Sequence, residues 1–397
     1  MTEIADSKQQ IELLKNNGGD DENFIHLLKS SLHKANRVAK EQLEPNLYDA
    51  LKWPQNLNEY VEYLEWFARW IPHQSKHKAW LAPGTDEHQE VYDHLCHFYW
   101  LINQKVEPDN TIVQSIPWFS EWLITYADLW GSFLNTTESF NKKALESYIN
   151  LSPKFAMQDS MIKDKPNAPS GWLTFNQFFA RELNPGLRPI ESPFDNSVVT
   201  CPADCTFKAQ YPIGADSSIP EITVKKTHKF ANVKDLLKKS KYASEFANGT
   251  FVHYFLGPYS YHRFHTPAAG TLRECYPVHG KVYLDVNIKG NQFDAPDSSQ
   301  GGYEFSQARG VVIIDTKDSP YGDIGIVGIV PIGMCQVSSV NMTATVGSDM
   351  LKGDEFGYFL FGGSDIIVLL QEGVEPTINT SLDYHHYGSL IANCKKS

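Results

Sequence analysis

Three short segments in the second half of the chain carry side chains that are able to do chemistry together. They are "CPADC" with Asp204, "YSYHRFHTPAAG" with His262 and His265, and "KGDEFGYFLFGGSD" with Ser364. A carboxylate, an imidazole and a hydroxyl are the parts of a nucleophile that is activated by a base, which the carboxylate in turn orients. The spacing does not show that these groups meet, because Asp204 also suits a turn after proline and the histidines suit opposite faces of a strand end.

Two glycines before Ser364 interrupt what the pattern otherwise predicts to be a continuous buried hairpin. Gly362 and Gly363 stand between the apolar runs "EFGYFLF" and "DIIVLL". Glycine weakens a strand interior and marks a bulge, a sharp bend or a close approach to the backbone. This segment alone predicts a bulge or tight turn, and a chemical role needs partners from elsewhere in the chain.

Two other kinds of site are weaker interpretations of the same residues. The two histidines with Cys201 or Cys205 would make a zinc site, but no pattern here has a dependable metal-ligand spacing. A serine hydrolase would need a G-x-S-x-G elbow, whereas Ser364 is followed by Asp365 and Ile366. We therefore expect no metal, and no hydrolase motif surrounds the serine.

The elements that must position these residues change character along the chain. From about residue 22 to 165, apolar residues recur at three and four positions, as in "LNEYVEYLEWFARWI" and "IPWFSEWLITYADLWGSFL", which predicts amphipathic helices. We expect the second of these helices to pack a core through one face, made of Trp118, Trp122, Leu129 and Phe133.

After the punctuating segment "KDKPNAPSG", one more short helix is predicted in "WLTFNQFFARELNPGLRPI", closed by Pro185-Gly186. Short β-rich runs separated by Gly and Pro follow, among them "SVVTC", "TFVHYFL", "GTLRECYPV", "GVVIIDT" and "IGIVGIVPIG". The sequence thus predicts an α+β protein with a flexible segment at 1–21, a helical accessory domain at 22–165 and a β-rich catalytic domain at 166–397.

Length and composition describe a globular protein with two domains. A chain of 397 residues exceeds one typical core, and its net charge of -12 argues against nucleic acid as a partner. No signal peptide or membrane-spanning run is apparent, and six scattered cysteines fit reduced thiols. We expect a cytoplasmic protein with at most peripheral membrane contact, and a homo-oligomer is compatible with the sequence.

Four blocks, in this order, resemble the phosphatidylserine decarboxylase family over roughly residues 165–397. They are "FNQFFARELNPGLRPI", "PAD" at 202–204, "YHRFHTPAAG" and "KGDEFGYFLFGGSD". Any one block is a weak signal, whereas all four in order are specific. The resemblance implies an enzyme that cuts its own chain between Gly363 and Ser364 and converts the serine into an N-terminal pyruvoyl group.

The same resemblance implies a role for each candidate residue. Ser364 Oγ would attack the Gly363 carbonyl, with His265 as general base and Asp204 holding its imidazole. His262 would lie near the substrate carboxylate or return a proton to the α-carbon. The pyruvoyl ketone would condense with the substrate amine and accept the electron pair released with carbon dioxide, which is the role of pyridoxal phosphate in other enzymes.

The family name points to phosphatidylserine as the substrate and phosphatidylethanolamine as the product, and this is the first expectation. The helical part, including "DLWGSFLNT", instead resembles the extra domain of a soluble branch that includes fungal enzymes decarboxylating tryptophan. Ala308-Arg309-Gly310 stands where lipid-acting members usually carry Asn-Glu-Arg, while "LNPGLRPI" and Asp204 are typical of lipid-acting members. Asp365 differs from the Thr or Ser that is commoner after the family's serine.

These features leave two further interpretations beside phosphatidylserine decarboxylation. A free amino acid, aromatic or otherwise, is the alternative substrate. An unprocessed binding protein with the same fold is a minor third interpretation, since a fold does not determine a function.

Overall fold

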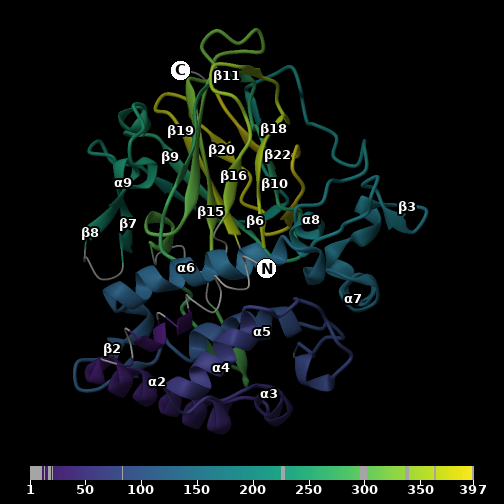
Figure 1. The fold of residues 1–397 in the computed structure, drawn as a ribbon. Coiled ribbons are helices and arrows are strands. Elements are labelled where there is room, and N and C mark those ends of the chain that lie inside the picture. Colours follow the sequence, from purple (N-terminus) through teal and green to yellow (C-terminus); the bar gives the residue numbers. More distant parts are fainter. Residues whose placement is uncertain are drawn as a thin grey trace. The chain divides into compact units, whose positions relative to one another are not determined.

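The computed structural model describes residues 11–12, 14–16, 19, 21–82, 84–224, 229–295, 302–335, 339–361 and 364–395 (Figure 1). They divide into two compact units, which are described separately. One unit comprises Met1–Met157, Ser170–Phe178 and Lys281–Asp297, and the other Gln158–Pro169, Phe179–Gly280 and Ser298–Ser397. Helices dominate the first and strands the second, which confirms the predicted α+β class. The flexible segment predicted at 1–21 lies mostly outside the described residues.

The first unit is helical, and its N-terminal part, Met1–Met157, is coloured purple to blue in Figure 1. Its described helices are α2 (Glu22–Gln42), α3 (Pro45–Ala50), α4 (Leu57–Phe67), α5 (Glu90–Trp100), α6 (Pro117–Leu134) and α7 (Lys142–Leu151). Two short strand pairs accompany them, β1 (Lys105–Val106) with β2 (Thr111–Ile112), and β12 (Asn287–Lys289) with β13 (Gln292–Asp294). No helix in the described part of the chain is long and apolar enough to cross a bilayer.

Several of these helices begin where the sequence supplies a polar cap. Asp21 accepts a hydrogen bond from the Phe24 amide at 2.9 Å at the start of α2. Asn141 accepts one from the Ala144 amide at 3.0 Å at the start of α7. These side chains satisfy amide groups that have no partner within the helix, so the caps determine where each helix begins.

Aromatic rings from α4, α5 and α6 form the core of the helical unit. The Phe67 ring lies 4.8 Å from Phe98 and 4.9 Å from Trp130, measured between centroids. The face that α6 buries includes Phe119, Trp122, Leu123, Tyr126 and Trp130. The predicted face is therefore offset, since Trp118, Leu129 and Phe133 are only half-buried. Because α6 is apolar on most of its surface, spacing alone indicates its buried face poorly.

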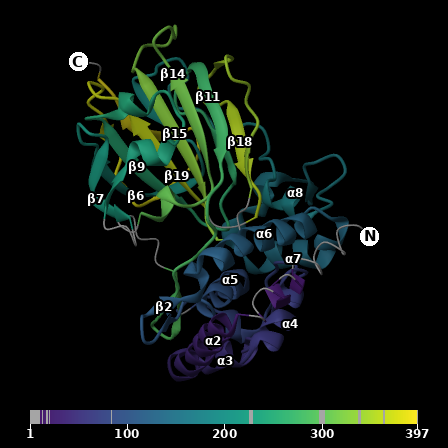
Figure 2. The same ribbon diagram turned by 60° about the vertical axis from the view of Figure 1, so that its left-hand side comes forward.

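The second unit is built around an antiparallel eight-stranded sheet, seen from two sides in Figures 1 and 2. In spatial order its strands are β17 (Asp349–Met350), β11 (Gly270–Val278), β14 (Arg309–Asp315), β15 (Ile326–Gly333), β19 (Ser364–Leu370), β9 (Thr250–Leu256), β6 (Cys205–Pro212) and β21 (Tyr384–His385).

Smaller sheets and the short helix α9 (Val233–Leu237) also belong to this unit. One sheet has the order β10 (Arg263–His265), β18 (Glu355–Phe359), β16 (Val340–Met342), and another β20 (Thr377–Ile378), β22 (Leu390–Asn393), β5 (Val198–Thr200). The strand pairs are β3 (Met161–Ile162) with β4 (Lys165–Pro166), and β7 (Ser218–Val224) with β8 (Lys229–Asn232). The short helix α8 (Phe175–Phe179) ends well before Pro185, and all of it except Phe179 belongs to the helical unit.

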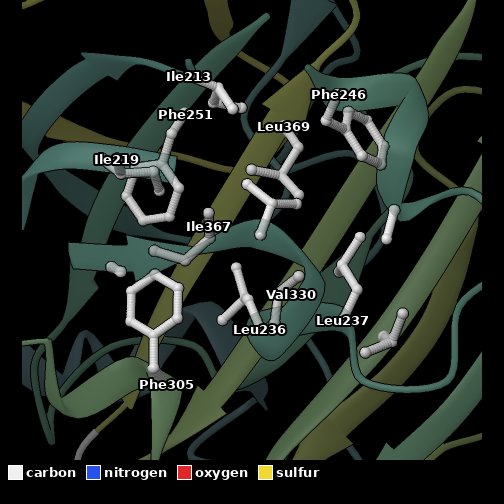
Figure 3. Packing of buried hydrophobic residues seen from close by; sticks show 14 of the residues in the cluster. Ile213, Ile219, Leu236, Leu237, Phe246, Phe251, Phe305, Val330, Ile367 and Leu369 are labelled. Carbon is white, nitrogen blue, oxygen red and sulfur yellow. The ribbon is translucent and has the colours of Figure 1, made fainter. Parts of the chain in front are cut away.

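β19 is an interior strand of the large sheet, and both of its faces are buried. Its residues alternate between the faces, so Asp365, Ile367 and Leu369 point to one side and Ser364 to the other. Ile367 and Leu369 belong to an apolar cluster with side chains of α9, β9 and β15 (Figure 3). This packing holds the strand that begins at Ser364 in a defined position.

The two strands on either side of Gly362-Gly363 do not pair with each other. β18 pairs with β10 and β16, whereas β19 pairs with β15 and β9. The predicted hairpin is therefore wrong, and the segment between them leads the chain from one sheet to another. Both strands are apolar, and an apolar pattern does not tell which sheet a strand joins. Gly362 and Gly363 themselves lie outside the described residues, as does any bulge at that position.

Candidate active site

Ser364 is the first residue of β19 and is completely buried. It lies opposite Gly333 of β15 and Leu256 of β9, so its main chain is fixed from both sides. Its side chain is 0% exposed, and its Oγ has no hydrogen-bond partner among the described residues. Buried hydroxyls are normally paired, so one without a partner calls for a functional explanation.

Asp204 lies in the loop between β5 and β6, where several donors surround its carboxylate. Arg188 donates from Nε and Nη2, the latter to Oδ2 at 2.7 Å. His386 Nδ1 lies 3.1 Å from Oδ2, and the Tyr387 amide donates to Oδ1 at 2.8 Å. Burial opposes the charge, but the hydrogen bonds from His386 and Arg188 outweigh it and hold the pKa of Asp204 below its usual range. Asp204 is therefore an anion at neutral pH.

His265 ends β10, and its two ring nitrogens have different partners. Nδ1 lies 2.8 Å from the Gly353 carbonyl oxygen, which only accepts, so the ring proton is on Nδ1. Nε2 then carries the lone pair and faces the Tyr261 hydroxyl at 3.2 Å. Burial lowers the pKa of His265 to about 4. The imidazole is consequently neutral at neutral pH, with its basic nitrogen at Nε2.

Asp204 and His265 are linked, but not by a hydrogen bond between their side chains within the described structure. The ring of Tyr387 lies on the imidazole, with centroids 3.8 Å apart and planes 7° from parallel, while its amide binds Asp204. In addition, the His265 amide donates to Pro202 O at 2.7 Å. The resemblance implies a direct contact between the Asp204 carboxylate and the His265 ring. The links through Tyr387 and Pro202 take its place, because the Gly353 carbonyl already occupies Nδ1.

His262 comes directly before β10 and is 0% exposed. Its ring stacks on Phe179, with centroids 3.9 Å apart. Burial, with a contribution from the Arg181 charge, lowers the pKa of His262 well below its usual range. His262 is a neutral imidazole in aromatic surroundings, and neither it nor His265 hydrogen-bonds Ser364 Oγ among the described residues.

A second buried polar group lies on the other face of β19. Asp365 is 0% exposed, its Oδ2 accepts a hydrogen bond from the Tyr303 hydroxyl, and its Oδ1 lies 3.5 Å from His253 Nε2. Asp365, which stands where the family more commonly has Thr or Ser, thus has Tyr303 and His253 as partners. A buried carboxylate requires such partners, because an unpaired charge in the interior is strongly unfavourable.

The cysteines near Asp204 form a close pair of thiols. Cys201 Sγ and Cys205 Sγ are 3.1 Å apart, and both residues are buried. Among the residues that the structure describes, no three His, Cys, Asp or Glu side chains are grouped so as to hold a metal ion.

Several of the residues that contact Asp204 and His265 stand in the same sequence blocks as the candidate residues. Arg188, Tyr261 and Gly353 stand in the blocks "LNPGLRPI", "YSYHRFHTPAAG" and "KGDEFGYFLFGGSD", so proximity to an assigned residue was an available signal. His386 and Tyr387 were not singled out at all. Their only signal is the concentration of rings in "YHHY", near the C-terminus.

Comparisons with known proteins identify the family to which the chain is similar. A family model described as phosphatidylserine decarboxylase matches residues 175–392. Similar proteins include "Decarboxylase iboD" of Amanita muscaria, 30% identical over 276 residues, which are 64% of this chain and 77% of that protein. "Phosphatidylserine decarboxylase proenzyme 2" of Oryza sativa subsp. japonica is 34% identical over 225 residues, or 55% of this chain and 33% of that protein.

A bacterial relative matches about as much of this chain as the rice protein does. "Phosphatidylserine decarboxylase proenzyme" of Chlamydia trachomatis is 30% identical over 212 residues, 53% of this chain and 64% of that protein. The family match covers more than half of the chain and includes Asp204, both histidines and Ser364. The chain therefore belongs to the phosphatidylserine decarboxylase family, a family of carboxy-lyases.

Proposed function

We propose that this chain cuts itself before Ser364, acquires a pyruvoyl group there and decarboxylates phosphatidylserine to phosphatidylethanolamine. The observation that carries the proposal is the Ser364 hydroxyl, which is buried and has no hydrogen-bond partner among the described residues. A hydroxyl that no structural hydrogen bond holds is able to turn toward a base that takes its proton. Ser364 sits at the first position of an interior strand, so its main chain is fixed on both sides. The two preceding residues in the sequence are glycines, which have no Cβ that would hinder an attack on the carbonyl.

In the cleavage step Ser364 Oγ attacks the Gly363 carbonyl carbon, and His265 Nε2 takes the hydroxyl proton. Neutral His265 suits this role, since burial keeps its pKa at about 4 and the Gly353 carbonyl holds the other nitrogen protonated. The Asp204 charge favours the imidazolium that forms. The Gly363–Ser364 amide becomes an ester through Ser364 Oγ. Elimination from this ester then releases a chain that ends at Gly363. Water finally hydrolyses residue 364, which releases ammonia and leaves the pyruvoyl group.

The residues around Ser364 suit the group that this sequence of steps would leave. A pyruvoyl group supplies a carbonyl that accepts the electron pair left behind by carbon dioxide. His262, neutral and stacked on Phe179, would take up a proton and pass it to the α-carbon of the product. Buried aromatic neighbours exclude water, which favours the loss of charge from a carboxylate.

A free amino acid is the second candidate substrate, and one observation favours it. The match to "Decarboxylase iboD" extends over 276 residues, further than the 225 and 212 residues shared with the rice and chlamydial proteins. Part of the helical half is thus shared with a decarboxylase whose name does not mention a phospholipid. Phosphatidylserine stays the first candidate because the family model and the other relatives carry its name.

Denaturing electrophoresis and intact mass spectrometry test the processing step. The expected result is two chains, residues 1–363 and residues 364–397 with a pyruvoyl N-terminus, whereas Ser364→Ala should give one uncut chain without activity. His265→Ala should also stay uncut, and His262→Ala should cut but decarboxylate poorly. A wild-type chain that stays whole and carries no pyruvoyl group would contradict the proposal and favour a binding protein.

Release of carbon dioxide distinguishes the substrates. Vesicles containing phosphatidylserine should support turnover, and sedimentation with these vesicles would reveal the expected peripheral membrane contact. Activity on free tryptophan, tyrosine or phenylalanine without activity on vesicles would instead establish the second candidate.

A further inference from the structure

Lys352 lies in the turn between β17 and β18, where its ammonium group is enclosed by main-chain carbonyls. The residue is 5% exposed, and Nζ donates to the carbonyl oxygens of Ser192, Asp195 and Val198 at 2.7, 2.6 and 2.7 Å. An ammonium group has three N–H donors, so all of them are used on one short segment of chain. Lys352 therefore ties the turn to the segment that leads into β5.

Burial of the Lys352 ammonium group costs free energy unless its three hydrogen bonds are formed. Burial lowers the pKa of Lys352 to about 8, against the opposite influence of Asp195 and Glu191. A methionine or leucine would fill the same space without burying a charge. The presence of the ammonium group indicates that the position of the turn matters more than the stability gained by an apolar side chain.

The residue that follows Lys352 is the one that contacts the proposed base. The Gly353 carbonyl accepts from His265 Nδ1 at 2.8 Å, and the Gly353 amide donates to Thr266 O at 2.8 Å. Gly353 has φ +89°, and a Cβ there would lie 2.5 Å from Ile190 Cδ1. The turn therefore requires glycine. It is joined to the end of β10 by the main-chain hydrogen bond from Gly353 to Thr266 and by the side-chain hydrogen bond from His265.

We propose that Lys352 is a positioning residue for self-cleavage, which fixes the Gly353 carbonyl and thereby keeps the proton of His265 on Nδ1. The inference rests on the proposed role of His265 as the base that activates Ser364. With the carbonyl in place, Nε2 carries the lone pair and is the nitrogen that is able to accept a proton. Without it, the proton is able to move to Nε2, and that tautomer is not able to accept the hydroxyl proton of Ser364.

Lys352→Met tests this directly, because it keeps the length of the side chain and removes the three donors. Timed samples from cell-free synthesis should show self-cleavage at least about tenfold slower than in the wild-type chain. In the uncut Ser364→Ala background, 15N NMR of labelled histidine should show His265 protonated at Nδ1 with Lys352 present and a mixture of tautomers with Met. The tautomer reports on the hydrogen bond between His265 Nδ1 and the Gly353 carbonyl.

Arg309 offers a matched control in the same unit. It is 1% exposed and donates to the carbonyls of Leu236, Gln307 and Asp235 at 2.7, 2.7 and 3.0 Å, so it is also a buried cation that binds three carbonyls. Arg309→Met should lower stability but leave the His265 tautomer unchanged. An equal change of tautomer in this control would mean that general loosening is responsible, and the inference would be wrong.

The outcomes separate this inference from the proposed function. If the wild-type chain does not cut itself, the proposed function fails. If it does, and Lys352→Met cuts at the same rate or keeps His265 protonated at Nδ1, the inference alone fails. Should Lys352→Met not fold, Lys352→Gln takes its place, because its amide keeps two donors; slower cleavage with a mixed tautomer supports the inference, and an unchanged tautomer overturns it.

Discussion

Tyr387 connects the two candidate groups that share no direct hydrogen bond, so replacing it tests how the site works. Its ring lies 3.8 Å from the His265 ring, and its amide donates to Asp204 at 2.8 Å. Tyr387→Leu removes the ring but keeps the amide. Tyr387→Phe keeps the ring and removes only the hydroxyl, which makes it the matched control.

The size of the effect follows from the stacked geometry. A well-stacked ring pair contributes about 0.5–1.5 kcal/mol beyond the area it buries, and 1.36 kcal/mol corresponds to a tenfold change in rate. If this free energy holds the imidazole in its reactive orientation, Tyr387→Leu slows self-cleavage roughly two- to tenfold. Tyr387→Phe should cut at the wild-type rate. Asp204→Asn should have a larger effect than either, because it removes the charge that favours the imidazolium.

The rate is measured from the loss of the full-length band after a pulse of cell-free synthesis. Thermal unfolding of the same variants in the Ser364→Ala background shows whether the uncut chain is folded. A Tyr387→Leu chain that is folded and cuts at the wild-type rate would refute the reasoning. So would a Tyr387→Phe chain that slows as much as Tyr387→Leu, because the ring itself would then not be responsible.

Three further results are expected from buried titratable groups. Because burial lowers the pKa of His265 to about 4, self-cleavage should be independent of pH near neutrality and decline only below about pH 4; a midpoint near the ordinary histidine pKa would contradict this. Burial lowers the pKa of His94 and His97 to about 3, so the unfolded chain binds more protons between about pH 6.5 and 3. The free energy of unfolding of the helical unit should therefore fall by several kcal/mol as pH falls through that window, because each histidine contributes about 1.4 kcal/mol per pKa unit. The urea midpoint of His97→Gln should vary less with pH than that of the wild-type chain. His253→Ala should destabilise the uncut Ser364→Ala chain by roughly 3–5 kcal/mol in urea, because it takes one partner from the buried Asp365 carboxylate; an unchanged midpoint would show that the pair does not stabilise the fold.

The sequence predicted the elements whose pattern is strong and local. The strands β9 and β11 coincide with the predicted runs "TFVHYFL" and "GTLRECYPV", because β-branched and aromatic residues are bounded there by Gly and Pro. The helices α4 and α6 lie within the stretches where apolar residues recur at three and four. β6 was not predicted, since Lys208 and Gln210 interrupt its apolar pattern.

Contacts between distant parts of the chain could not be predicted in the same way. Asp204 and Tyr387 are 183 positions apart, and no periodicity relates them. Likewise, Lys281–Asp297 follows the strands of the second unit in sequence yet belongs to the helical unit. The types of the candidate residues indicated the chemistry, while the order of the strands determines which side chains surround them.

β19 lies where a new chain end would arise, and this has a consequence for how the protein holds together. A cut before Ser364 turns residues 364–397 into a separate small subunit, in which β19 pairs on both sides, β21 pairs with β6 and β22 pairs with β5. These pairings would keep the small subunit bound without a covalent link. Unfolding of the mature protein then separates two molecules, so its midpoint should rise with protein concentration, whereas that of the uncut chain should not. The chain would have to fold before it is cut, and the mature pair would not refold as readily once diluted.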